Sequence, residues 1–127
     1  MLKSYRELLV WQKGTDLAVE CYRFSSAFPK AETYGLTSQI RRAAVSIPAN
    51  IAEGYGRGSR KEYVQFLLIA QGSLKELETH IIIAERLAYL TRAQRDRELA
   101  LTNARQFDPA LEATASSFRL DPTPYTL

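Results

Sequence analysis

Apolar residues recur at intervals of three and four along most of the chain, the spacing of one face of an α-helix. Four segments show this pattern, over residues 6–27, 36–53, 60–90 and 92–118. No segment alternates apolar and polar residues with a period of two, so no strand is predicted. The short polar connections favour an all-α domain built as an antiparallel up-down-up-down four-helix bundle. We expect this bundle over residues 1–119 and an extended or disordered tail over residues 120–127, which hold two prolines.

Capping signals and prolines predict where these helices begin and end. Phe28–Pro29 should end the first helix, because a residue before proline is pushed out of helical conformation. Gly54 is predicted as the C′ residue of the second helix. Asp108–Pro109 predicts a kink or a restart in the fourth. The capping box S/T-x-x-E/Q, which satisfies free N–H groups at a helix start, occurs at Ser4, Ser59 and Thr91.

The second predicted helix contains a proline and a polar face. Pro48 removes the backbone hydrogen bond to the Ala44 carbonyl and predicts a kink around neighbouring helices. Alternatively, the freed carbonyl serves a site near Asn50. The polar face is interpreted as a network between subunits, with a channel lining or a contact to a partner protein as alternatives. Its residues are Gln39, Arg42, Ser46, Asn50 and Glu53.

The third predicted helix, residues 60–90, has apolar residues around most of its circumference. One stripe is expected to face the core, from Tyr63 and Phe66 to Ala84 and Ala88. A second apolar set lies off that stripe, so the helix should be buried on more than one side. The simplest additional cover is another copy of the chain. The predicted contact between subunits therefore includes Leu68, Ile69, Ile82 and Ile83.

Composition narrows the class of protein. The chain has 127 residues, a single-domain length, and its 17 Lys+Arg against 14 Asp+Glu give a net charge of only +3. This bias is mild for a dedicated nucleic-acid binder. The N-terminal sequence lacks the apolar run of a signal peptide, and no segment is long and apolar enough to span a membrane. With one cysteine, Cys21, and no internal disulfide, a cytoplasmic protein is expected.

The sequence offers few residues suited to catalysis or to metal binding. His80 is the single histidine, so it cannot supply the two Glu-x-x-His pairs of a di-iron bundle, and no G-x-S-x-G motif accompanies it. Cys21 lies on an apolar stripe and is predicted to be a small buried side chain. The arginines of residues 92–98 alternate with acidic residues and are expected to form a solvated face. We therefore expect no catalytic residue, no metal and no cofactor.

The most positive segment is residues 41–62. Its glycine-rich part, residues 54–58, follows a helix and lacks the GK[ST] ending of a P-loop, so it predicts a tight turn between helices. The start of the next helix, at Ser59, offers free N–H groups that attract phosphate. We hypothesise contact with the backbone of RNA or DNA, strengthened where several copies present the segment on one rim. The basic residues are Arg41, Arg42, Arg57, Arg60 and Lys61.

Several motifs resemble those of one bacterial family. They are Leu9-Val10-Trp11-Gln12-Lys13, Asp16-Leu17-Ala18, Phe28-Pro29, residues 32–43, Ser46-Ile47-Pro48-Ala49-Asn50-Ile51-Ala52-Glu53-Gly54, and residues 66–79. Together they resemble the four helix bundle protein family, also called the 23S ribosomal RNA intervening-sequence protein family, over about residues 5–90. The resemblance implies a four-helix bundle assembled as a ring, a homopentamer, and an association with ribosomal RNA.

These observations favour a non-enzymatic oligomeric binding or scaffold module. It is expected to contact structured RNA through a basic rim. The alternative is a protein–protein adaptor, or an accessory factor of a nucleic-acid-processing enzyme, without direct RNA contact. A more distant similarity to the accessory bundle of diversity-generating retroelements, which partners a reverse transcriptase, implies the second kind of role.

Overall fold

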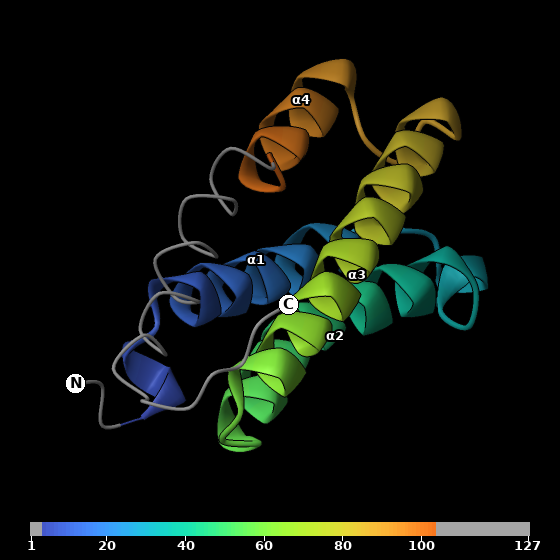
Figure 1. The fold of residues 1–127 in the computed structure, drawn as a ribbon. Coiled ribbons are helices and arrows are strands. Elements are labelled where there is room, and N and C mark those ends of the chain that lie inside the picture. Colours follow the sequence, from blue (N-terminus) through green and yellow to red (C-terminus); the bar gives the residue numbers. More distant parts are fainter. Residues whose placement is uncertain (1–3, 104–127) are drawn as a thin grey trace.

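The computed structural model of the protein describes residues 4–103, and over this range the chain is all-α without any strand (Figure 1). The prediction of four helices is confirmed. The predicted kink at 108–109, the rest of the fourth helix and the tail 120–127 lie outside the described residues. The elements, in chain order, are the 3-10 helix η1 (Tyr5–Glu7), α1 (Leu9–Ser25), the 3-10 helix η2 (Lys30–Glu32), α2 (Leu36–Gly56), α3 (Arg60–Arg86) and α4 (Arg92–Leu101).

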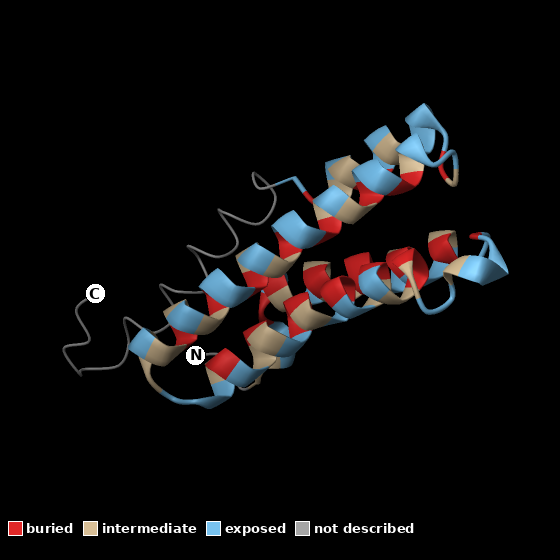
Figure 2. Ribbon diagram, turned by 90° about the vertical axis from the view of Figure 1, so that its right-hand side faces the viewer, coloured by how far each residue is buried: buried red, intermediate tan, exposed pale blue. Residues whose placement is uncertain are grey.

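Helix α2 is the centre of the described fold. It packs along α3 over the largest interface and against α1 over the second largest, while α4 contacts mainly α3. The buried positions of α1, α2 and α3 face one another in Figure 2, and the outer side of α3 is exposed. Burial of aliphatic side chains stabilises this arrangement by about 1.5–3 kcal/mol for each one. The most deeply buried of these aliphatic side chains are Val10, Ile40, Ile47, Ile51, Leu77 and Ile81.

The first helix begins later than the capping pattern predicted. The Ser4 hydroxyl accepts the Arg6 N–H at 3.1 Å, so it caps the short η1 and not α1. Leu8 then adopts an extended backbone, with φ −71° and ψ 124°, and α1 starts at Leu9. Because the Leu8 side chain is buried in the core, its burial offsets the interruption of the helix.

The second helix continues past its predicted end. Gly54 is not its C′ residue, since α2 runs to Gly56 and the left-handed conformation belongs to Gly58, with φ +81°. Gly54 is buried against α3, where a Cβ would stand 2.4 Å from the Cβ of Phe66. Glycine is needed here because two helix backbones approach closely, and not because the chain turns.

The third helix ends at Arg86, four residues before the predicted end. The Tyr89 N–H donates to the Ala84 carbonyl and the Ala88 N–H donates to the Glu85 carbonyl, both at 2.9 Å. This pair of bonds is a Schellman motif, which requires a left-handed residue. Ala88 takes that conformation, with φ 62°, and lies exposed in the turn instead of in the predicted core stripe.

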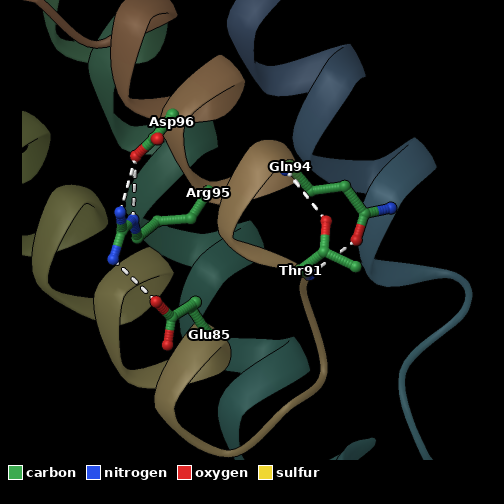
Figure 3. Close-up of polar contacts among 5 residues, drawn as sticks. All are labelled: Glu85, Thr91, Gln94, Arg95 and Asp96. Carbon is green, nitrogen blue, oxygen red and sulfur yellow. Dashed lines mark hydrogen bonds and ion pairs between the residues drawn. The ribbon is translucent and has the colours of Figure 1, made fainter.

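The start of α4 confirms the capping box at Thr91. The Thr91 hydroxyl accepts the Gln94 N–H at 3.1 Å, and the Gln94 side chain accepts the Thr91 N–H at 2.8 Å (Figure 3). Arg95 then bridges Glu85 of α3, at 2.6 Å, and Asp96, at 2.8 Å. The expected solvated face is therefore wrong for Arg95, which joins α4 to α3.

Glu98 also departs from the expected solvated face. It is 3% exposed, and burial raises the pKa of its carboxyl to about 7, with a further contribution from the neighbouring carboxyl of Glu20 on α1. Glu20 is in turn 3.4 Å from Arg97. A buried carboxyl that stays protonated avoids the cost of placing an unpaired charge in the interior.

The close approach at Gly54 predicts a cost for the smallest side chain. Gly54→Ala should lower the free energy of unfolding by about 1–3 kcal/mol, because the new methyl group overlaps Phe66 and the helices must separate. The matched control is Gly56→Ala, also in α2, where an added Cβ meets nothing within 4 Å. Urea denaturation of both variants measures the difference. Equal stability of the two variants would contradict the proposed role of Gly54.

The pKa of Glu98 predicts a dependence of stability on pH. The folded pKa of about 7 lies above the ordinary value of 4.5, so the folded chain binds a proton that the unfolded chain releases. With respect to this group, stability should be greatest below about pH 4.5, fall as the pH rises from 4.5 to 7, and level off above pH 7. Glu98→Gln should remove this fall and raise stability at pH 8 by about 2 kcal/mol.

The measurement is urea denaturation at intervals between pH 5 and pH 8. Asp16→Asn, which changes an exposed carboxyl on α1, is the control and should keep the wild-type pH dependence. A Glu98→Gln variant with the same pH profile as the wild type would show that Glu98 does not titrate in this window.

Candidate nucleic-acid interface

The turn between α2 and α3 is held by a local cap. The Ser59 hydroxyl accepts the Glu62 N–H at 3.1 Å, as the capping pattern predicted. The Glu62 carboxylate accepts from that hydroxyl at 3.2 Å and not from the Ser59 N–H, so the box is incomplete. Gly58 provides the left-handed residue that reverses the chain. The turn thus presents the N-terminal end of the 27-residue helix α3 at the surface.

Three basic side chains surround this turn, and we refer to Arg57, Arg60 and Lys61 as the basic turn. Arg57 forms a solvent-exposed ion pair with Glu53 at 2.9 Å, a weak pair that leaves its charge available to a ligand, and lies over the Phe66 ring at 5.3 Å. Lys61 is exposed and has no ion pair among the described residues. Arg60 is half-buried, and its buried Nε has no acceptor among them. Two positive charges therefore remain without a carboxylate partner beside free helical N–H groups.

Arg41 and Arg42 lie elsewhere on α2. Sixteen positions separate Arg41 from Arg57, which corresponds to roughly 24 Å along a helix. The Arg41 guanidinium lies 4.6 Å from the Tyr22 ring centre, and donates to the Ser25 hydroxyl at 2.9 Å and the Tyr22 carbonyl at 3.2 Å. Arg42 is exposed. The five predicted basic residues thus divide between two ends of α2 and do not form one patch (Figure 1).

The polar face of α2 forms hydrogen bonds within one chain. The Ser46 hydroxyl is 2.7 Å from that of Ser73 on α3, and the Asn50 amide donates to the Ser46 carbonyl at 2.7 Å. Asn50 therefore does not use the carbonyl of Ala44 that Pro48 leaves free. A polar groove of about 350 Å³ lies beside these bonds, lined by Gln39, Arg42, Ala43, Ser46, Ser73 and Glu76.

Glu53 does not line that groove and pairs with Arg57. The hydroxyl network thus joins α2 to α3 of the same chain. A contribution of Gln39, Ser46, Asn50 and Glu53 to a contact between subunits, or to a channel, stays a prediction.

The apolar set predicted to contact other subunits lies on the outer side of α3. Leu68, Ile69, Ile82 and Ile83 are 39–61% exposed. The buried residues of the same helix are Tyr63, Leu67, Ala70, Leu74, Leu77, Ile81 and Ala84. Four solvent-exposed large aliphatic side chains on one helix are typical of a surface that contacts another protein chain. Their burial by a second copy stays a prediction.

The remaining reactive side chains have little catalytic potential. Cys21 is buried, as predicted, and burial, with smaller contributions from Glu98 and Glu20, raises the pKa of its thiol to about 12. Such a thiol stays protonated and unreactive near neutral pH. The imidazole of His80 is largely buried, and its Nε2 lies 3.3 Å from Glu76 Oε1.

Residues 4–103 contain no cluster of three His, Cys, Asp or Glu side chains suited to a metal ion. None of the helices in the same range combines the length and the apolar character needed to cross a bilayer.

Two exposed aromatic residues were not singled out from the sequence. Tyr34 precedes α2 and is 97% exposed, and Tyr22 on α1 is 45% exposed. Both lie at the end of α2 that carries Arg41 and Arg42. The sequence offered a signal for Tyr34, because it is an aromatic residue in a polar connection, outside any apolar stripe that would place it in the core.

Residues 4–103 thus form an all-helical unit with a basic turn at one end of α2 and an exposed apolar face on α3. The chain is a member of the 23S rRNA-intervening sequence protein family, whose model matches residues 6–105. The resemblance seen in the sequence motifs is thereby confirmed.

A solved structure supports the same assignment. It is a protein of unknown function from the S23 ribosomal protein family of Bacteroides thetaiotaomicron, 25% identical, with a TM-score of 0.70. The match covers 83% of this chain and 97% of that chain. No curated protein matches the sequence.

Proposed function

We propose that this protein is a non-enzymatic, cytoplasmic binding module that contacts structured RNA through the basic turn. The observation that carries the proposal is the pair of positive charges, Arg60 and Lys61, without carboxylate partners at the start of α3. A phosphate at this position meets two cations, free backbone N–H groups and the positive end of the helix dipole. The family description, which refers to 23S rRNA intervening sequences, supports RNA as the ligand.

Assembly with further copies of the chain is part of the proposal. We propose that the helices form an antiparallel up-down-up-down bundle. Copies then associate through Leu68, Ile69, Ile82 and Ile83 into a ring, a homopentamer as the family resemblance implies. Each copy adds one basic turn. The positive charge near these turns in the assembly is therefore larger than the net charge of +3 per chain suggests. Several weak contacts on one RNA then raise the overall affinity.

The second candidate function is a protein–protein adaptor without direct RNA contact. The exposed apolar face of α3 favours it, because such a face binds protein partners as readily as sister subunits. A partner that itself processes nucleic acid would account for the family description equally well.

Removing charge from the basic turn separates these functions. Arg57→Gln with Lys61→Gln should lower the affinity for a structured RNA hairpin at least tenfold. It should also reduce the slope of log K against log salt by about 1–2, since fewer counterions are released. Arg60 is left unchanged because its Nε is buried. Fluorescence anisotropy over a range of salt concentrations gives both quantities.

The matched control for this experiment is Arg86→Gln with Arg92→Gln, two exposed arginines at the opposite end of α3 and at the start of α4. It removes the same charge and should change affinity only slightly. Equal RNA binding by both double variants and the wild type would favour the adaptor function.

The assembly predicts a change in molecular mass. Leu68→Glu with Ile82→Glu should convert the oligomer to monomer, because two carboxylates would be buried in the interface. Val19→Glu, at an exposed apolar position on α1, should keep the oligomer. Light scattering at micromolar concentration measures the mass. A monomeric wild type under these conditions would rule out the proposed assembly.

A further inference from the structure

We propose that the α1–α2 end of the molecule binds an unpaired nucleotide of RNA, with the base stacked on Tyr34. The site is a concavity of about 530 Å³ at the surface, lined by Tyr22, Tyr34, Arg41, Arg42 and neighbouring hydroxyl side chains. This inference rests on the proposed function and adds a second, chemically different contact to it. We call this concavity the stacking site.

The Tyr34 ring is free and its backbone is fixed. The side chain is 97% exposed, and it makes no ring contact or hydrogen bond with the described residues. Glu32, two residues before Tyr34, binds the two residues that follow it: its carboxylate accepts the Leu36 N–H at 3.1 Å and its carbonyl accepts the Gly35 N–H at 2.9 Å. The Tyr89 hydroxyl donates to the same carboxylate at 2.8 Å. Because the backbone is already ordered, a base that stacks here must order only the ring itself.

A second flat surface is provided by Arg41 and Tyr22. The guanidinium lies 4.6 Å from the ring centre and is fixed by bonds to the hydroxyl groups of Ser25 and Ser26 and to the Tyr22 carbonyl. Tyrosine rings and guanidinium planes are the groups on which proteins stack unpaired bases of RNA. The volume of the concavity falls within the range of about 300–1,000 Å³ found for small-ligand sites.

The charge of the site suits a phosphate. The partners of Arg41 are all neutral oxygens, and Arg42 has no ion pair among the described residues. No carboxylate belongs to the lining, and Thr33, Thr37 and Ser38 add hydroxyl groups. The nearby Glu32 carboxylate is occupied by two donors, which lower its pKa. Positive charge, hydroxyl groups and exposed aromatic rings together favour a nucleotide over an apolar segment of a protein.

Two RNA probes test the inference on the full chain. The first is a short blunt duplex, and the second is the same duplex with an adenosine bulge containing 2-aminopurine. We expect the wild type to bind the bulged RNA more tightly and to quench 2-aminopurine fluorescence on stacking. Tyr34→Ala should weaken binding of the bulged RNA about 5- to 100-fold and abolish the quenching, while leaving the duplex affinity within about twofold. Tyr34→Phe keeps the ring and should behave like the wild type.

The outcomes distinguish this site from the basic turn. Arg57→Gln with Lys61→Gln should weaken both RNAs alike, whereas Tyr34→Ala affects only the bulged one. Wild-type affinity and quenching in Tyr34→Ala would overturn the stacking site and leave the basic turn intact. A changed molecular mass of Tyr34→Ala with unchanged RNA binding would instead assign the surface to a contact between copies. Binding of neither RNA by the wild type would overturn both proposals.

Discussion

The rest of the structure depends on how closely α2 approaches its two neighbours. Gly14 of α1 lies against Ile47 and Pro48, and Gly54 of α2 lies against Phe66 of α3. Helices pack at interaxial distances of about 8–10 Å, and the smaller residues at a crossing set the lower value. With both crossings fixed, α2 is buried on one side from Leu36 to Gly54. Its two ends then carry the two surfaces that bear unpaired positive charge.

Periodicity predicted the helices well and their boundaries less well. The spacing of apolar residues identifies which face of a helix is buried, and Cys21, Ala70, Leu74 and Ile81 are buried as expected. A boundary depends on contacts between helices that the local sequence does not contain. Gly54 has the sequence features of a helix end, yet α3 passes over it and the helix continues. Local signals were correct where the cap is closed by its own segment, as at Thr91.

The candidate site was predictable in residue type but not in arrangement. The sequence shows that residues 41–62 are rich in arginine and lysine. It does not show which of these basic side chains form ion pairs. In the structure, Arg57 is paired with Glu53 and Arg95 with Glu85, whereas Lys61 and Arg42 have no carboxylate partner in the described part of the chain. Arg41 turns toward α1 because Tyr22 and Ser25 lie within its reach. Partners distant in sequence therefore decide which cations remain available to a ligand.

The placement of those cations constrains the kind of RNA that suits this protein. Helix α2 has 21 residues, so the stacking site and the basic turn of one chain stand roughly 30 Å apart. A uniform duplex offers phosphates to the basic turn but no base to the stacking site, because its bases are already stacked. An RNA with a helical segment and an unpaired nucleotide offers both contacts. Since phosphate contacts position an RNA and base contacts discriminate among RNAs, selectivity in this proposal comes from the stacking site and not from the basic turn.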